Sequence, residues 1–111
     1  MISMMTRRAL PLAAAVALVL MTPARAADGN AVTIDDFRFS PATLTVPVGG
    51  KVTWTNRDDE PHTVLAAEPK GLFKSPPLDT GDSFSFTFDK PGTYKYFCSV
   101  HPHMTGVIVV N

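Results

Sequence analysis

Short segments of alternating apolar and polar residues, separated by glycine and proline turns, constrain the fold of this chain most. The clearest alternation runs from Ser83 to Phe88, where phenylalanine occupies every second position. A period of two is typical of a strand with one buried face, whereas an amphipathic helix repeats apolar residues three and four apart. Comparable segments recur at 32–39, 43–48, 52–56, 94–98 and 106–110. The pattern predicts an all-β fold, and the frequent turns are typical of a small antiparallel sandwich.

The stretch from Ala66 to Leu78 has little strand character. Pro69, Gly71 and the pair Pro76-Pro77 interrupt it, so we expect a loop that has room for one helical turn. An acidic run, residues 58–60, is expected to be a solvated turn, and the alternative is a docking patch for a basic partner.

The N-terminus has the organisation of an export signal. Arg7 and Arg8 precede an apolar stretch over 9–21, and Ala24-Arg25-Ala26 has the small-x-small form of a cleavage site. We therefore expect a cleaved signal peptide over residues 1–26 and a single mature domain over 27–111. The apolar stretch is too short to span a bilayer, so we expect a periplasmic protein with no membrane anchor in the mature chain. The paired arginines leave both the Sec and the twin-arginine routes open.

Charge excludes one class of partner. The whole chain carries ten basic and ten acidic residues, and three of the basic ones lie in the expected signal. The mature domain would carry seven basic and ten acidic residues, a net charge near −3. With no basic patch, binding to nucleic acid is not expected.

The segment Cys98-Ser99-Val100-His101-Pro102-His103-Met104 carries the chemistry of the chain. Cys98 is the only cysteine, so it is neither half of an internal disulfide nor part of a zinc site with paired thiolates. The alternative is an inert buried thiol, which the neighbouring imidazole and thioether make less plausible. A thiolate, an imidazole and a weak thioether form the donor set that suits copper cycling between Cu(I) and Cu(II).

A second imidazole completes the expected site. His62 is the one histidine outside the Cys98 loop, and it precedes a short apolar segment, residues 63–65. If this segment neighbours the strand before Cys98, the side chains of His62, Cys98, His101 and Met104 can meet at one end of a sandwich. We therefore expect one copper ion per chain in a His2Cys-plus-Met site.

His103 has no settled role. It could be a further donor, a second surface contact for copper or a pH-sensitive residue of the rim, and the plainest alternative is an exposed imidazole.

The chain resembles the cupredoxins, the blue copper proteins, and among them most the amicyanins. The spacing Cys-x-x-His-x-x-Met and the form His-Pro-x-Met at Met104 carry much of this resemblance. The remaining matches cover nearly the whole mature chain: Phe39-Ser40-Pro41, Gly49, Trp54, Pro61-His62, Gly92-Thr93-Tyr94 and the terminal valine strand. The resemblance implies a Greek-key β-sandwich in which His62, Cys98 and His101 are equatorial ligands and Met104 is a long axial one.

Three features depart from the amicyanin pattern. Thr63 follows the first ligand histidine where the family usually has asparagine, and we expect its hydroxyl to take over part of the bonding, towards Ser99. His103 replaces a phenylalanine, and the mature N-terminus is short enough to lack a first strand. These departures leave the redox partner open, including methylamine dehydrogenase.

The leading functional hypothesis is a monomeric carrier of single electrons between a donor and an acceptor protein, bound transiently. An apolar rim of Pro61, Pro102 and Phe73 is expected around His101. The alternative is a periplasmic copper-delivery protein, which the single methionine of the mature chain disfavours. An enzyme is not expected, because the chain has three histidines in total and copper oxidases need a second centre.

Overall fold

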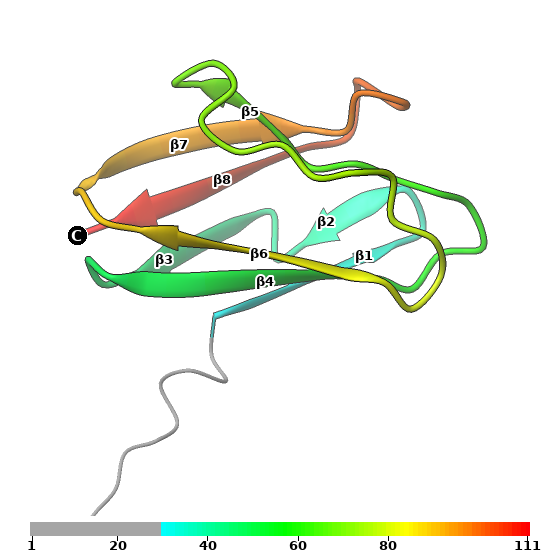
Figure 1. The fold of residues 1–111 in the computed structure, drawn as a ribbon, viewed down its shortest axis with the longest axis horizontal. Helices are drawn as coiled ribbons and strands as arrows, with labels where there is room; N and C mark the ends of the chain where they lie inside the picture. The colour runs from blue at the N-terminus through cyan, green and yellow to red at the C-terminus, as the bar shows by residue number, and fades with distance from the viewer. Residues whose placement is uncertain (1–29) are drawn as a thin grey trace, which may run out of the picture.

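The computed structural model describes residues 30–111, which form eight strands in two facing sheets (Figure 1). The strands are β1 (Ala31–Asp35), β2 (Arg38–Ser40), β3 (Thr43–Val46), β4 (Gly50–Asn56), β5 (Leu65–Glu68), β6 (Ser83–Phe88), β7 (Gly92–Phe97) and β8 (Thr105–Val110). The expected all-β sandwich is confirmed. Within residues 30–111 no helix has the length and apolar character to cross a membrane. The predicted signal peptide, residues 1–26, lies outside the described part of the chain.

Each sheet has four strands and mixes the two pairing directions. One sheet has the order β2-β1-β4-β6 and the other β3-β8-β7-β5. The predicted antiparallel pairing holds for β1–β2, β4–β6, β5–β7 and β7–β8, whereas β1–β4 and β3–β8 are parallel. Alternation decides which face of a strand is buried but carries no information on the direction of its neighbour. The parallel pairs therefore had no signal in the sequence.

Aromatic rings fill the space between the sheets. Trp54 and Tyr96 are fully buried and meet edge to face, with ring centroids 5.4 Å apart. Phe73 packs beside them and is itself buried, and its ring centroid lies 5.6 Å from that of Trp54. The expectation that Phe73 lies in an exposed rim was therefore wrong, because its ring packs against Trp54 and Tyr96 in the core. Phe84 is only half-buried, because β6 is an edge strand.

The structure corrects the predicted secondary structure of two segments, 32–39 and 66–78. The segment 32–39 forms two strands rather than one, because Asp36 and Phe37 both adopt left-handed backbone, with φ of 53° and 56°, and reverse the chain. The loop expected over 66–78 begins as strand β5, whose Leu65 pairs with Phe97 of β7. β5 is short and has a register shift after Ala66, so its pattern was too brief to recognise.

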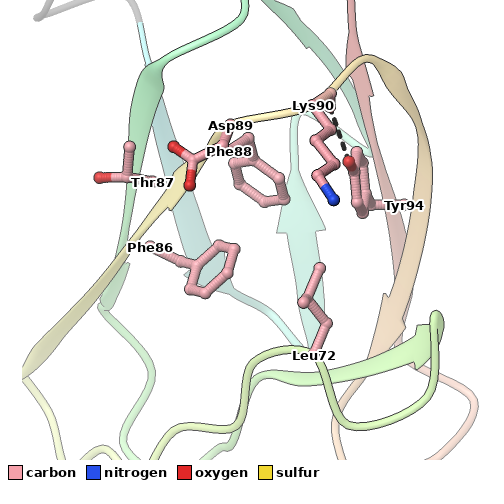
Figure 2. Close-up of a pocket in the computed structure, with 7 residues that line it drawn as sticks. All are labelled: Leu72, Phe86, Thr87, Phe88, Asp89, Lys90 and Tyr94. Atoms are coloured by element: carbon pink, nitrogen blue, oxygen red, sulfur yellow. Dashed lines mark hydrogen bonds between the residues drawn. The ribbon is translucent and has the colours of Figure 1, made fainter.

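A surface cavity of about 150 Å³ opens beside β6 and β7, away from the candidate metal ligands. Phe86, Phe88, Tyr94 and Leu72 supply its apolar walls (Figure 2). The Tyr94 hydroxyl donates to the Lys90 carbonyl at 2.6 Å and so closes the turn between the two strands.

Gly106 is required by the packing of Tyr96, its partner across β7 and β8. A Cβ atom on Gly106 would overlap the Tyr96 ring, which is fully buried and has no free space to move into. We expect Gly106→Ala to lower the free energy of unfolding of the metal-free protein by about 1–3 kcal/mol, the usual cost of overpacking. Urea denaturation measures it, with Thr105→Ala as the control on the same strand, expected to change stability by less than about 0.5 kcal/mol. An equally small effect of Gly106→Ala would show that the ring can move aside.

Candidate metal centre

The four predicted ligands come from two parts of the chain that meet at one end of the sandwich. His62 lies between β4 and β5, where its backbone pairs with Leu78 in an isolated bridge. Cys98 directly follows β7, His101 lies in the next loop, and Met104 directly precedes β8. Figure 1 shows the β4–β5 loop and the β7–β8 loop at the same end of the two sheets. The pairing of β5 with β7, which the sequence analysis assumed, brings them together.

Three donor atoms converge on one point. The ligand atoms of His62, Cys98 and His101 all lie within 4.8 Å of one another. Cys98 Sγ is 3.8 Å from His62 Nδ1 and 3.9 Å from His101 Nδ1. Metal–sulfur and metal–nitrogen bonds of about 2.3 and 2.0 Å at a trigonal angle place sulfur and nitrogen roughly 3.7 Å apart. The spacing therefore fits one metal ion between the three atoms.

Hydrogen bonds close the ligand loop on itself. The Cys98 amide donates to the Met104 carbonyl at 3.1 Å, and the Met104 amide donates to the His101 carbonyl at 2.9 Å. Met104 is buried, with 2% of its surface exposed. These backbone bonds hold Met104 next to Cys98 and His101 in the chain.

Exposure separates one predicted ligand from the others. His62 and Cys98 are completely buried, whereas 22% of the His101 side chain is exposed. His101 is thus the side chain through which the site reaches the surface.

The surroundings of Cys98 favour a thiolate. Burial by itself raises the pKa of this thiol, but hydrogen bonds from the Thr63 amide and from His62 and His101 outweigh burial and lower the pKa to about 6. The Thr63 amide lies 3.4 Å from the sulfur. A thiolate is the form of cysteine that binds a metal, so the group is prepared for one.

Thr63 and Ser99 join the two ligand segments, as the sequence predicted. The Thr63 hydroxyl lies 2.8 Å from the Ser99 hydroxyl and accepts a hydrogen bond from the Ser99 amide, also at 2.8 Å. These bonds link the residue after His62 to the residue after Cys98.

Asp58 and Phe37 are neighbours of the predicted ligands that the sequence analysis missed. Asp58 was expected in a solvated turn, yet its carboxylate accepts a 2.8 Å hydrogen bond from His62 Nε2. Burial raises the pKa of Asp58, but hydrogen bonds from the Phe37 amide, His62 and the Asp36 amide lower it overall. The Phe37 ring lies edge to face with both imidazoles, 5.4 Å from His62 and 5.1 Å from His101. The spacing of four residues between Asp58 and His62 was the one available signal.

His103 is exposed, and its ring centroid lies 6.4 Å from that of His101. Among its alternatives, this position fits the exposed imidazole of the rim, outside the converging donor atoms.

Comparison with known proteins places this geometry in a family. A family model described as a cupredoxin-like domain matches residues 9–110. Amicyanin-alpha of Methylorubrum extorquens is 35% identical over 93% of this chain and 98% of its own. A solved structure titled as a novel purple cupredoxin from Nitrosopumilus maritimus is 40% identical, with a TM-score of 0.69 over 73% of this chain and 98% of that one.

A copper-containing nitrite reductase from Thermus scotoductus is also similar in structure, with 34% identity and a TM-score of 0.68 over 73% of this chain. Only 22% of that enzyme is covered, so the likeness extends to one part of it. The match over most of the sequence, the two facing sheets and the converging donor atoms agree, and the chain belongs to the cupredoxin family.

Proposed function

We propose that this protein carries single electrons between redox proteins through one copper ion bound by His62, Cys98, His101 and Met104. The observation that supports it most is the convergence of two imidazole nitrogens and one thiolate within 4.8 Å at a buried position. One thiolate with two imidazoles and a thioether is the donor set of blue-copper electron-transfer sites.

Each residue has a distinct part in the proposed carrier. Bound copper supplies a one-electron couple. Cys98 presents its sulfur as a thiolate, and His62 is fixed in a fully buried position. His101 provides the partly exposed edge at which a partner can approach. The Thr63–Ser99 bonds hold the two ligand segments at constant separation, which favours a redox change with little movement.

The partner side of the proposal rests on the surface around His101. Glu60 lies 4.0 Å from His101 Nε2, and Asp59 beside it is exposed. Negative charge next to the exposed ligand favours a redox partner with basic side chains, held briefly by a small interface. A monomer that forms such transient contacts fits this picture.

Export and periplasmic localisation form part of the proposal. The support is the basic, apolar and small-residue order of residues 1–26, together with a single thiol that needs burial or a metal in an oxidising compartment.

Copper delivery is the second candidate, and exposed His103 beside His101 is the observation in its favour. The exposed imidazole of His103 could bind a copper ion transiently as the ion leaves the site next to His101. The burial of the other three ligand residues favours the carrier.

Reconstitution of the purified mature domain with copper(II) tests the proposal. We expect one copper per chain, an intense visible band from the thiolate and complete, reversible bleaching by one electron equivalent. The hue is not part of the prediction, since a similar cupredoxin is described as purple. Visible absorption during a redox titration measures all three. Binding without the intense band would mean that Cys98 is not a ligand and would contradict the proposal.

A further inference from the structure

We propose that Asp58 is a positioning residue that fastens the Asp36–Phe37 turn to His62, so that the Phe37 ring braces both imidazoles from the solvent side. The inference rests on the proposed function, because one of its tests uses the copper-bound protein. The other test uses the metal-free protein and does not depend on copper binding.

The turn between β1 and β2 has an unusual sequence for its shape. Two-residue hairpin turns with positive φ at both positions favour Asn-Gly or Asp-Gly, because glycine has no Cβ to clash. Here the second position is Phe37, with φ of 56°. A bulky residue in left-handed backbone is rare and needs support from its surroundings. Phe37 therefore occupies this position for a reason other than turn preference.

The carboxylate of Asp58 supplies the support. Its Oδ1 accepts the Asp36 amide at 2.9 Å, and its Oδ2 accepts the Phe37 amide at 2.9 Å. The same Oδ2 accepts His62 Nε2 at 2.8 Å. One carboxylate thus binds both residues of the turn and a proposed copper ligand.

Asp58 is itself anchored. Its amide donates to the Asn56 side chain at 2.8 Å, and the Thr80 hydroxyl donates to its carbonyl. Its side chain is 12% exposed, so water competes little for these bonds. The position of Asp58 is fixed independently of the turn that it holds.

The bonds to Asp58 also determine which nitrogen of His62 faces the metal site. A carboxylate only accepts, so His62 Nε2 carries the proton that points at Asp58. When a metal ion is bound, the other nitrogen, Nδ1, presents its lone pair on the side of Cys98 Sγ, which lies 3.8 Å from it. A carboxylate on the distal nitrogen of a ligand histidine fixes both the tautomer and the ring orientation.

Phe37 extends this restraint to His101. Its ring stands nearly perpendicular to both imidazoles, at 87° to His62 and 83° to His101. The two imidazole centroids are 5.0 Å apart, so one ring contacts both at once. Phe37 is 39% exposed, with the remainder of its surface covered in the fold. The brace thus reaches the partly exposed ligand, which lacks a buried environment of its own.

The first test uses the metal-free protein. Asp58→Ala removes the carboxylate that accepts from all three donors, so the turn should detach. We expect amide hydrogen exchange at Phe37 to accelerate about tenfold or more, as loss of a bond to a charged acceptor implies, and less at Asp36, whose amide also donates to the Asp35 carboxylate. Asp59→Ala is the matched control, with the same change at an exposed neighbour, and should leave both amides unchanged. Equal exchange at Phe37 in Asp58→Ala and the wild type would overturn the proposal.

The second test separates bracing from fold stability. Phe37→Gly suits left-handed backbone, which offsets part of the burial lost with the ring. The metal-free protein should therefore stay folded, with its unfolding equilibrium constant raised no more than about 30-fold, which is about 2 kcal/mol in free energy. The brace is lost, so Cu(I) should leave for a chelator about tenfold faster, the lower end of the effect of outer-sphere support for a metal ligand. The lines in the electron paramagnetic resonance spectrum of the copper(II) protein should broaden, because His101 samples more orientations. A purely structural residue would move stability and metal retention together.

Unchanged Cu(I) release and an unchanged copper(II) spectrum in Phe37→Gly would overturn the bracing role. If the wild-type protein gives no intense copper band, the proposed carrier fails. The amide exchange of the metal-free variants still decides whether Asp58 fastens the turn, so the two failures are distinguishable.

Discussion

Replacing Cys98 with serine should abolish the intense visible band of the copper(II) protein and weaken copper binding by more than about 100-fold, beyond what loss of a supporting residue costs. The band arises from charge transfer between a thiolate and copper, and Cys98 is the only cysteine of the chain. Serine retains the shape of the side chain but stays protonated and binds copper weakly. Visible absorption and a competition titration with a chelator measure the two effects.

Met104→Leu is the matched control, because it removes the other sulfur donor from the same loop and keeps the thiolate. This variant should still bind copper and absorb strongly, while its reduction potential rises, since an axial thioether is a long and weak ligand. An intense band that survives in Cys98→Ser would sink the assignment of the thiolate. Loss of copper in Met104→Leu would instead make the thioether a primary ligand.

The proposed ligand loop could be recognised in the sequence because its donor residues lie close together along the chain. The three residues Cys98, His101 and Met104 lie within seven consecutive positions, so they can be recognised as one group without knowledge of the fold. His62 followed because it was the one histidine left outside the loop. The Thr63–Ser99 contact was predictable too, since it joins the residues that follow two ligands.

The supporting shell could not be predicted in this way. Asp58 reaches His62 through a loop, and its bonds to Asp36 and Phe37 span more than twenty positions. These hydrogen bonds depend on a left-handed turn at Asp36 and Phe37, and an Asp-Phe pair is not a sequence that predicts such a turn. An acidic run and an alternating apolar residue have ordinary explanations in an exposed turn and a strand face, and only the pairing of β1, β2 and β4 removes those explanations.

The fold shows the same division between local and distant information. The Phe84–Phe88 alternation identified β6, yet the half-burial of Phe84 and Phe86 depends on the edge position of β6 in its sheet. The apolar character of Phe73 gave no sign of whether it covered the site or filled the core. Contacts with Trp54 and Tyr96 decided that question.

The reduced protein should exchange electrons rapidly with its oxidised form and yet surrender Cu(I) slowly to a competing chelator. His62 and Cys98 are fully buried and Met104 nearly so, which leaves His101 as the one proposed ligand that a chelator can approach. Three further donors must then detach before the ion leaves. Line broadening in mixtures of the two oxidation states measures self-exchange, and absorption of the chelator complex measures release.

Thr63→Val tests whether the hydrogen bonds of the Thr63 hydroxyl slow the release of Cu(I). The substitution removes the two 2.8 Å contacts between Thr63 and Ser99 and the 3.7 Å contact of the Thr63 hydroxyl with Cys98 Sγ, while keeping the branched shape. At about 1 kcal/mol for each hydrogen bond, Cu(I) release should accelerate roughly tenfold or more. Thr63→Ser keeps the hydroxyl and should release Cu(I) at nearly the wild-type rate. Rapid transfer of Cu(I) from the wild-type protein, together with sluggish self-exchange, would favour copper delivery, because a delivery site must open where a carrier site stays closed.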